Sequence, residues 1–91
     1  MPLFVAKRTL PGITPDALMS AGARAKTCCA EMTQEGESVR WVRSFFLPAT
    51  EQTHCYFDAA TREAVLEANQ RARLPFDEIV EVVELTPEVV Q

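Results

Sequence analysis

The chain has a single histidine, His54, and it stands next to Cys55, one of only three cysteines. Imidazole nitrogens and thiolates are common ligands of transition metals, and histidine also moves protons in catalysis. Residues 53–57 are rich in β-branched and aromatic types and predict a strand. Because successive side chains of a strand point to opposite faces, His54 and Cys55 do not reach one ion from a regular strand.

The two neighbours therefore call for separate interpretations. We interpret Cys55, which shares a strand face with Phe57, as a packing residue, because a buried free cysteine behaves as a small hydrophobe. His54 is the candidate metal ligand. A site built on His54 would take carboxylates such as Asp58 or Glu81 as further ligands, with copies from two subunits.

The pattern of apolar residues predicts the elements that position these side chains. We expect strands at about residues 3–10, 38–47, 53–57 and 78–85, and helices at about 14–36 and 61–73. Thr14 and Thr61 suit helix N-caps, and Gly36 suits the end of the first helix. The order βαββαβ is typical of an α+β, ferredoxin-like fold, in which two helices cover one face of a four-stranded antiparallel sheet.

The second strand carries large apolar side chains on both of its faces. Val39, Trp41 and Phe45 have one parity, and Val42 and Phe46 have the other. Helices on one side leave the opposite face uncovered, and such a face is polar in a monomer. We therefore expect a homodimer of the dimeric α/β-barrel type, in which two sheets face each other around a cavity for a small-molecule ligand.

The candidate ligand-pocket residues are those expected to line this inter-sheet cavity: Trp41, Arg43, Phe45, His54, Tyr56 and Glu81. Arg43 between two aromatic residues of its own parity would place one cation on an apolar wall, which suits a carboxylate, enolate or phenolate. His54, Tyr56 or Glu81 could then transfer protons.

Three function classes stay open from the residues alone. The first is a small dimeric protein that binds a small ligand or a divalent metal in the inter-sheet cavity. The alternative is a cofactor-independent isomerase or cyclase that acts on an aromatic or polyketide-like molecule. The third is a structural or regulatory dimer without a ligand.

Length and composition exclude several other classes. The 91 residues, of which 47% are hydrophobic, predict one globular domain over residues 1–91, with a short tail from about residue 86. The formal charge of -4 and the scattered basic residues argue against nucleic acid and membrane partners. No stretch is long and apolar enough to span a bilayer, and the odd number of cysteines argues against a disulfide framework, so we expect a cytoplasmic protein with reduced thiols.

Several short motifs, in order along nearly the whole chain, resemble a bacterial family of small ferredoxin-like proteins that is nickel-binding-protein-like. They are residues 1–4 (MPLF), 41–45 (WVRSF), 55–59 (CYFDA) leading into 63–65 (EAV), and 74–79 (LPFDEI). The resemblance implies the ferredoxin-like fold, the dimeric barrel with its internal cavity, and nickel as the bound metal. Relatives often have a histidine at the position of Arg43, and some have another near Ala68. Arginine is not a metal ligand, so His54 is the one imidazole here that could bind nickel.

Overall fold

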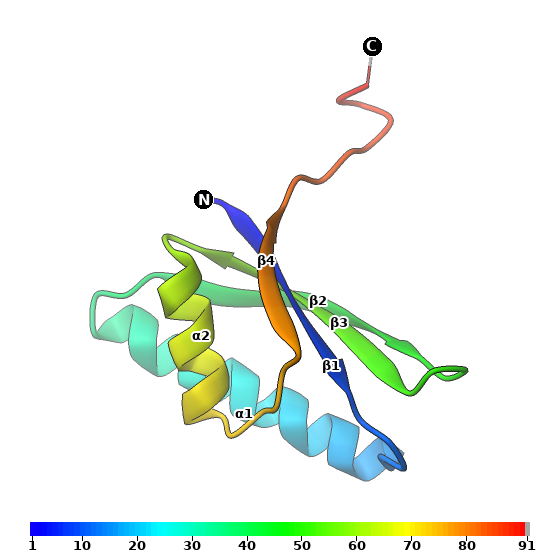
Figure 1. The fold of residues 1–91 in the computed structure, drawn as a ribbon. Coiled ribbons are helices and arrows are strands. Elements are labelled where there is room, and N and C mark those ends of the chain that lie inside the picture. Colours follow the sequence, from blue (N-terminus) through cyan, green and yellow to red (C-terminus); the bar gives the residue numbers. More distant parts are fainter. Residues whose placement is uncertain (91) are drawn as a thin grey trace.

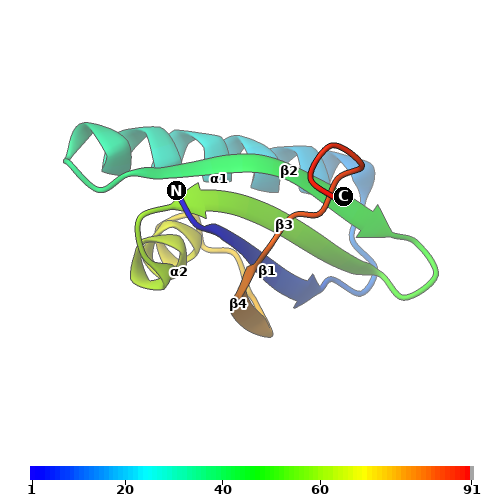
Figure 2. The same ribbon diagram turned by 90° about the horizontal axis from the view of Figure 1, so that it is seen from above.

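The fold is a four-stranded sheet with two helices on one side, in the predicted order βαββαβ (Figure 1). The computed structural model describes residues 1–90. The elements are β1 (Leu3–Thr9), α1 (Pro15–Gln34), β2 (Val39–Leu47), β3 (Gln52–Ala59), α2 (Arg62–Arg71) and β4 (Glu78–Val82). The strands are ordered β2-β3-β1-β4, and every neighbouring pair is antiparallel. The ferredoxin-like α+β prediction is confirmed, and the view in Figure 2 looks onto the sheet with the helices behind it.

None of the helices in this part of the chain is long and apolar enough to cross a membrane.

Helix α1 begins and ends at the predicted signals. The side chain of Thr14 accepts a hydrogen bond from the backbone amide of Ala17 at 3.1 Å, which satisfies one of the free amides of the first turn. At the other end, Gly36 has φ +100°, and the next amide, of Glu37, donates to the carbonyl of Met32 at 2.9 Å. This left-handed closing turn favours glycine, which explains why the helix stops there.

Helix α2 uses the same two devices, but a non-glycine residue closes it. Thr61 accepts from the amide of Ala64 at 3.1 Å. After the last turn Arg73 has φ +57°, and the amide of Leu74 donates to the carbonyl of Asn69 at 2.9 Å. A left-handed conformation is costly for a residue with a Cβ atom, so this turn holds some backbone strain.

The hydrophobic core lies between the helices and the face of the sheet that they cover. Its members are Phe4, Ala6, Cys29, Met32, Val39, Phe57, Ala59, Ala64, Val65, Ala68 and Ile79. Phe57 is the largest of the fully buried side chains. Small buried residues such as Ala25 in α1 and Ala64 and Ala68 in α2 let both helices approach the sheet closely.

A β-bulge in β2 changes which of its side chains share a face. Trp41 lies opposite Phe57 in β3, whereas Arg43 already lies opposite Tyr56, so Val42 is an extra residue. A bulge of this kind reverses the alternation of the side chains that follow. Trp41 therefore packs against the core under the helices, and the prediction that it shares a face with Arg43 and Phe45 is wrong.

The last strand is shorter than predicted. β4 ends at Val82, not at residue 85, because its partner β1 begins at Leu3, the residue that pairs with Val82. Residues 83–90 leave the sheet and rise from its uncovered side (Figures 1 and 2). The large apolar side chains of this segment are exposed: Val83, Leu85, Val89 and Val90.

Candidate functional site

Four of the six predicted pocket residues lie together on the uncovered face of the sheet. In the register of β2 and β3, Phe45 is opposite His54, and Arg43 is opposite Tyr56. The rings of Phe45 and Tyr56 are 6.3 Å apart between centroids and stand almost perpendicular, at 79°, the edge-to-face geometry that aromatic pairs prefer. We call Arg43, Phe45, His54 and Tyr56 the open-face patch.

The open-face patch continues across the sheet into β1 and β4. Tyr56 is opposite Val5, and Val5 is opposite Val80. Neighbouring side chains already bury Val5 to 2% exposure, whereas Phe45 is 58% exposed and Val80 is 37% exposed. The exposed apolar surface of this face therefore lies on its two edge strands, at Phe45 of β2 and Val80 of β4.

Glu81 does not belong to the open-face patch, and the prediction that it lines the same cavity as Arg43 is wrong. Its partner in β1 is Phe4, a core residue on the helix-covered side, so Glu81 has the parity of that side. In addition, β4 and β2 are the two edges of the sheet, with β3 and β1 between them. Glu81 therefore cannot pair with Arg43 or act on a molecule bound beside it.

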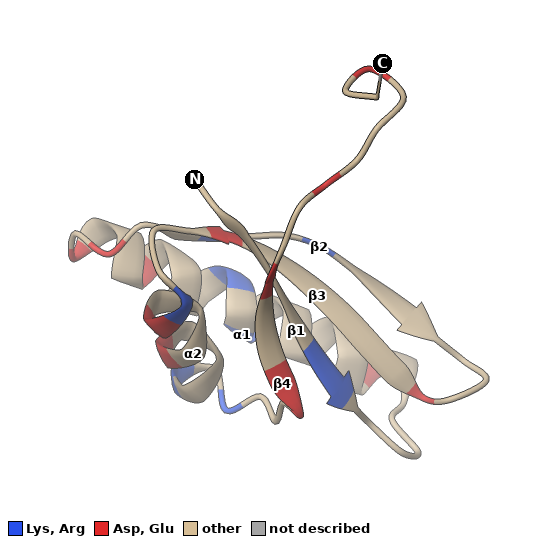
Figure 3. Cartoon of the chain, turned by 45° about the horizontal axis from the view of Figure 1, so that its top comes forward, with Lys and Arg blue, Asp and Glu red and all other residues tan. Residues whose placement is uncertain are grey.

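The other charged residues of the open face pair with one another. Lys7 Nζ lies 3.3 Å from Glu78 Oε1, and Figure 3 shows this basic end of β1 beside the acidic start of β4. Arg40 forms an ion pair with Asp58. Within residues 1–90, Arg43 makes no ion pair and leaves one uncompensated positive charge on this face.

The surroundings of His54 do not form a metal site within one chain. No group of three or more His, Cys, Asp or Glu residues in the part of the chain that the structure describes could hold a metal ion. Asp58, the predicted co-ligand, is four residues further along β3, which is about 13 Å, and Arg40 already binds its carboxylate. The residue directly opposite His54 in β1 is Lys7, whose positive charge disfavours a bound cation.

The cysteines do not supply the missing ligands. Cys29 is 4% exposed, and burial raises the pKa of its thiol to about 11. Because the thiolate is the form that binds metal, Cys29 is a poor ligand at neutral pH. Its position in the hydrophobic core shows that Cys29 is a packing residue of α1. Cys28 and Cys55 are free and half-buried.

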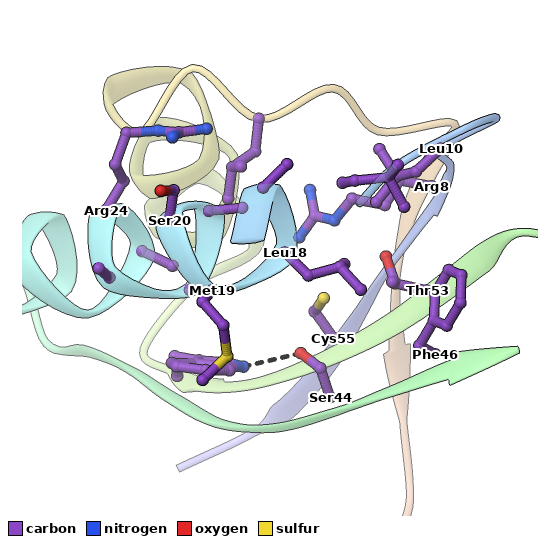
Figure 4. Close-up of a pocket in the computed structure, with 18 of the residues that line it drawn as sticks. Arg8, Leu10, Leu18, Met19, Ser20, Arg24, Ser44, Phe46, Thr53 and Cys55 are labelled. Atoms are coloured by element: carbon purple, nitrogen blue, oxygen red, sulfur yellow. Dashed lines mark hydrogen bonds between the residues drawn. The ribbon is translucent and has the colours of Figure 1, made fainter. Parts of the chain in front are cut away.

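A pocket of about 710 Å³ lies on the other side of the sheet, between α1 and strands β2 and β3 (Figure 4). Most of its wall is apolar and includes Leu18, Met19, Trp41 and Phe46. Gly22 of α1 makes room for the Trp41 ring, because a Cβ atom at that position would lie 3.2 Å from the ring. No pattern in the sequence alone predicts this pocket.

The polar floor of the pocket consists of Arg8 and its partner across the strands, Thr53. Arg8 Nη1 donates to Asn69 Oδ1 and to the carbonyl of Pro75, each at 2.8 Å. Arg8 Nη2 and Thr53 Oγ1 are buried and have no hydrogen-bond partner within residues 1–90. One sequence signal could have indicated this site: Arg8 has the same parity in β1 as Phe4 and Ala6, so a charge lies on the buried face of a strand.

Comparison with known proteins places the chain in a family. The profile described as "Nickel responsive protein SCO4226-like" matches residues 4–82. The chain belongs to the SCO4226-like family. A solved structure, described as the crystal structure analysis of SCO4226 from Streptomyces coelicolor A3(2), is 26% identical to this chain and covers 92% of it and 99% of its own length, with a TM-score of 0.75. A search of curated proteins found no match.

Membership of the SCO4226-like family confirms the resemblance seen in the sequence, and the similar crystal structure agrees with the ferredoxin-like fold. It relates this chain to proteins described as nickel responsive. The family description names no ligand residue, and in this chain the open-face patch and the pocket under α1 are two candidate places for a ligand.

Proposed function

We propose that this member of the SCO4226-like family is a homodimer that binds a small anionic ligand between two facing sheets. The observation that carries the proposal is the open-face patch, an uncovered apolar surface that contains a cation without a counter-ion. Phe45 of this patch is 58% exposed, and exposed apolar surface of this kind marks an interface.

A second copy of this chain is the partner that best fits the open face. The ion pairs Lys7–Glu78 and Arg40–Asp58 neutralise most of the charge at its rim, so two identical faces do not repel each other strongly. The segment 83–90 rises from the same side and exposes Val83 at 81% and Leu85 at 73%. Such an apolar arm can pack on a partner that sits against the sheet.

The enclosed space would then be lined by His54, Tyr56 and Arg43 from both copies. Arg43 offers a guanidinium group for a carboxylate or phenolate, and the rings of Phe45 and Tyr56 offer contact for an apolar body. The positive charges of Arg43 and Lys7 near His54 favour an anion over a cation at this place.

Nickel binding is the second candidate, and membership of a nickel responsive family favours it. Since one chain offers a single imidazole, the ion would be bound by His54 from both copies of the dimer. This arrangement requires the same sheet-to-sheet contact as the first candidate.

Sedimentation velocity tests the dimer. We expect the protein to sediment at twice the monomer mass at micromolar concentration, and Phe45→Glu to sediment as a monomer because it places a charge in the apolar interface. The control is Thr27→Glu, which introduces the same charged side chain at an exposed position of α1. This variant should remain dimeric. A folded wild-type protein that sediments as a monomer would rule out the proposal.

Titration calorimetry separates the two ligands. Nickel binding at His54 predicts a binding isotherm with Ni²⁺ that disappears in His54→Ala. Anion binding predicts an isotherm with 1-naphthoate that weakens by roughly tenfold in Arg43→Ala, the loss expected for one charge-assisted hydrogen bond. Absence of heat with Ni²⁺ would rule out the nickel candidate. Equal affinity of the wild type and Arg43→Ala for 1-naphthoate would rule out Arg43 as the group that binds the anion.

A further inference from the structure

We propose that the pocket under α1 is a second binding site, specific for a small organic carboxylate with an apolar body, and that Arg8 and Thr53 bind its carboxylate group. This site is on the helix-covered side of the sheet and does not depend on the dimer or on the open-face patch.

The first step is the charge of Arg8. Its side chain is among the buried polar groups, at 3% exposure, and none of the ion pairs formed within residues 1–90 includes it. Asn69 and Pro75 provide two neutral acceptors, both to Nη1. A guanidinium group without a counter-ion is costly in an apolar setting, and an anionic ligand would remove that cost.

The second step is the direction of the free donors. Arg8 Nη2 and Thr53 Oγ1 belong to directly opposite residues of β1 and β3, and both lack a hydrogen-bond partner in the described part of the chain. In Figure 4 the side chains of Arg8, Thr53 and Cys55 point into the space between α1 and the sheet. One N–H and one hydroxyl side by side match the two oxygens of a carboxylate.

The third step is the distribution of polarity along the pocket. The polar floor is deep, because Arg8 is 3% and Thr53 is 4% exposed, whereas Met19 at the rim is 77% exposed. Leu18 and Phe46 also line the pocket and are apolar. Both are more exposed than the floor and less exposed than Met19 at the rim. A ligand would therefore enter with its carboxylate first and leave an aliphatic or aromatic body against α1 and β2. The volume of about 710 Å³ is in the range of small-molecule sites.

The fourth step is that Arg8 is held in place before a ligand arrives. Its acceptor Asn69 is itself fixed, because Asn69 Nδ2 donates to the carbonyl of Val65 at 2.8 Å. This bond orients the amide so that Oδ1 faces Arg8. A guanidinium group fixed by two hydrogen bonds loses little freedom on binding, which favours affinity.

The test uses the only tryptophan of the chain as a local probe. Trp41 lines this pocket, so its fluorescence should change saturably when decanoate binds, and the neutral analogue decanol should bind at least tenfold more weakly. Arg8→Met should weaken decanoate binding by about 100-fold, the upper range for a lost hydrogen bond between charged groups. Arg71→Met, the same change at an exposed position of α2 that lines neither this pocket nor the open-face patch, is the matched control and should leave the affinity unchanged.

Thr53→Val provides an independent variant if Arg8→Met does not fold. The hydroxyl of Thr53 has no partner in the chain, so its removal should not destabilise the ligand-free protein, yet decanoate should bind about tenfold more weakly. The proposal is overturned if decanoate gives no saturable change, if decanol binds as tightly, or if Arg71→Met weakens binding as much as Arg8→Met. If Arg8→Met does not fold, an unchanged affinity of Thr53→Val for decanoate also overturns the proposal.

Discussion

Arg8 and Asn69 are 61 residues apart in the sequence, and their side chains meet in a buried hydrogen bond of 2.8 Å that joins β1 to α2. Asn69 is 1% exposed and is the only side-chain acceptor of the Arg8 guanidinium group within residues 1–90. The bond connects the core to the floor of the pocket under α1, so it bears on both stability and binding.

We predict that Asn69→Leu lowers the free energy of unfolding by about 3 kcal/mol, because the buried cation loses an acceptor. Asn69→Asp should remain within about 1 kcal/mol of the wild type, since a carboxylate can accept the same bond. Urea denaturation measures both, with Gln70→Leu at the next, exposed position as the control. Equal effects of Asn69→Leu and Gln70→Leu would contradict this role.

A second prediction concerns the contact between α1 and β2. A Cβ atom at position 22 would lie 3.2 Å from Cη2 of Trp41, and the indole is held by a 2.9 Å hydrogen bond from Nε1 to Ser44 Oγ. Gly22→Val should therefore lower stability by about 1–3 kcal/mol, the usual cost of overpacking, and should shift the Trp41 emission. Ala23→Val, on the exposed side of the same turn, should change stability by less than about 0.5 kcal/mol.

The left-handed turn after α2 gives a prediction of increased stability. Arg73 has φ +57°, and no hydrogen bond or ion pair of its side chain is present within the described chain. Arg73→Gly should raise the free energy of unfolding by about 1 kcal/mol, because glycine adopts this conformation without strain. The reverse change after α1, Gly36→Ala, should lower the free energy of unfolding by a similar amount, because Gly36 has φ +100°. An added Cβ atom at this position would meet no other atom, so the loss would come from the backbone conformation alone. Thermal unfolding measures both variants. Shifts of Tm with the same sign in Arg73→Gly and Gly36→Ala would contradict this account.

The buried thiol of Cys29 predicts a loss of stability at alkaline pH. Its pKa is raised from 9.0 to about 11 by burial, so the unfolded chain loses the proton first as pH increases. Between pH 9 and 11 the unfolded state therefore binds fewer protons than the folded state, and the free energy of unfolding falls with pH. Below pH 9 the thiol keeps its proton in both states, so its contribution to stability is fully present there. Denaturation curves at pH 8, 9.5 and 10.5 should show a steeper decline for the wild type than for Cys29→Ala, and parallel declines would be evidence against it.

Local signals in the sequence determined most of the fold. The caps at Thr14 and Thr61 and the stop at Gly36 depend on residues within a few positions of each other, so the sequence alone predicted where the helices begin and end. The shared face of His54 and Tyr56 also followed from strand alternation over two residues. For the same local reason, the sequence revealed the order of elements and the family resemblance.

Only the tertiary structure decided how distant residues combine. The bulge at Trp41 and Arg43 reverses the faces of β2, and it arises from pairing with β3, which no short pattern encodes. Glu81 could not be placed from its own strand, because its face depends on the register with β1. The contact of Arg8 with Asn69 depends on how α2 packs against the sheet, and that packing helps to bury the charge at the floor of the pocket under α1.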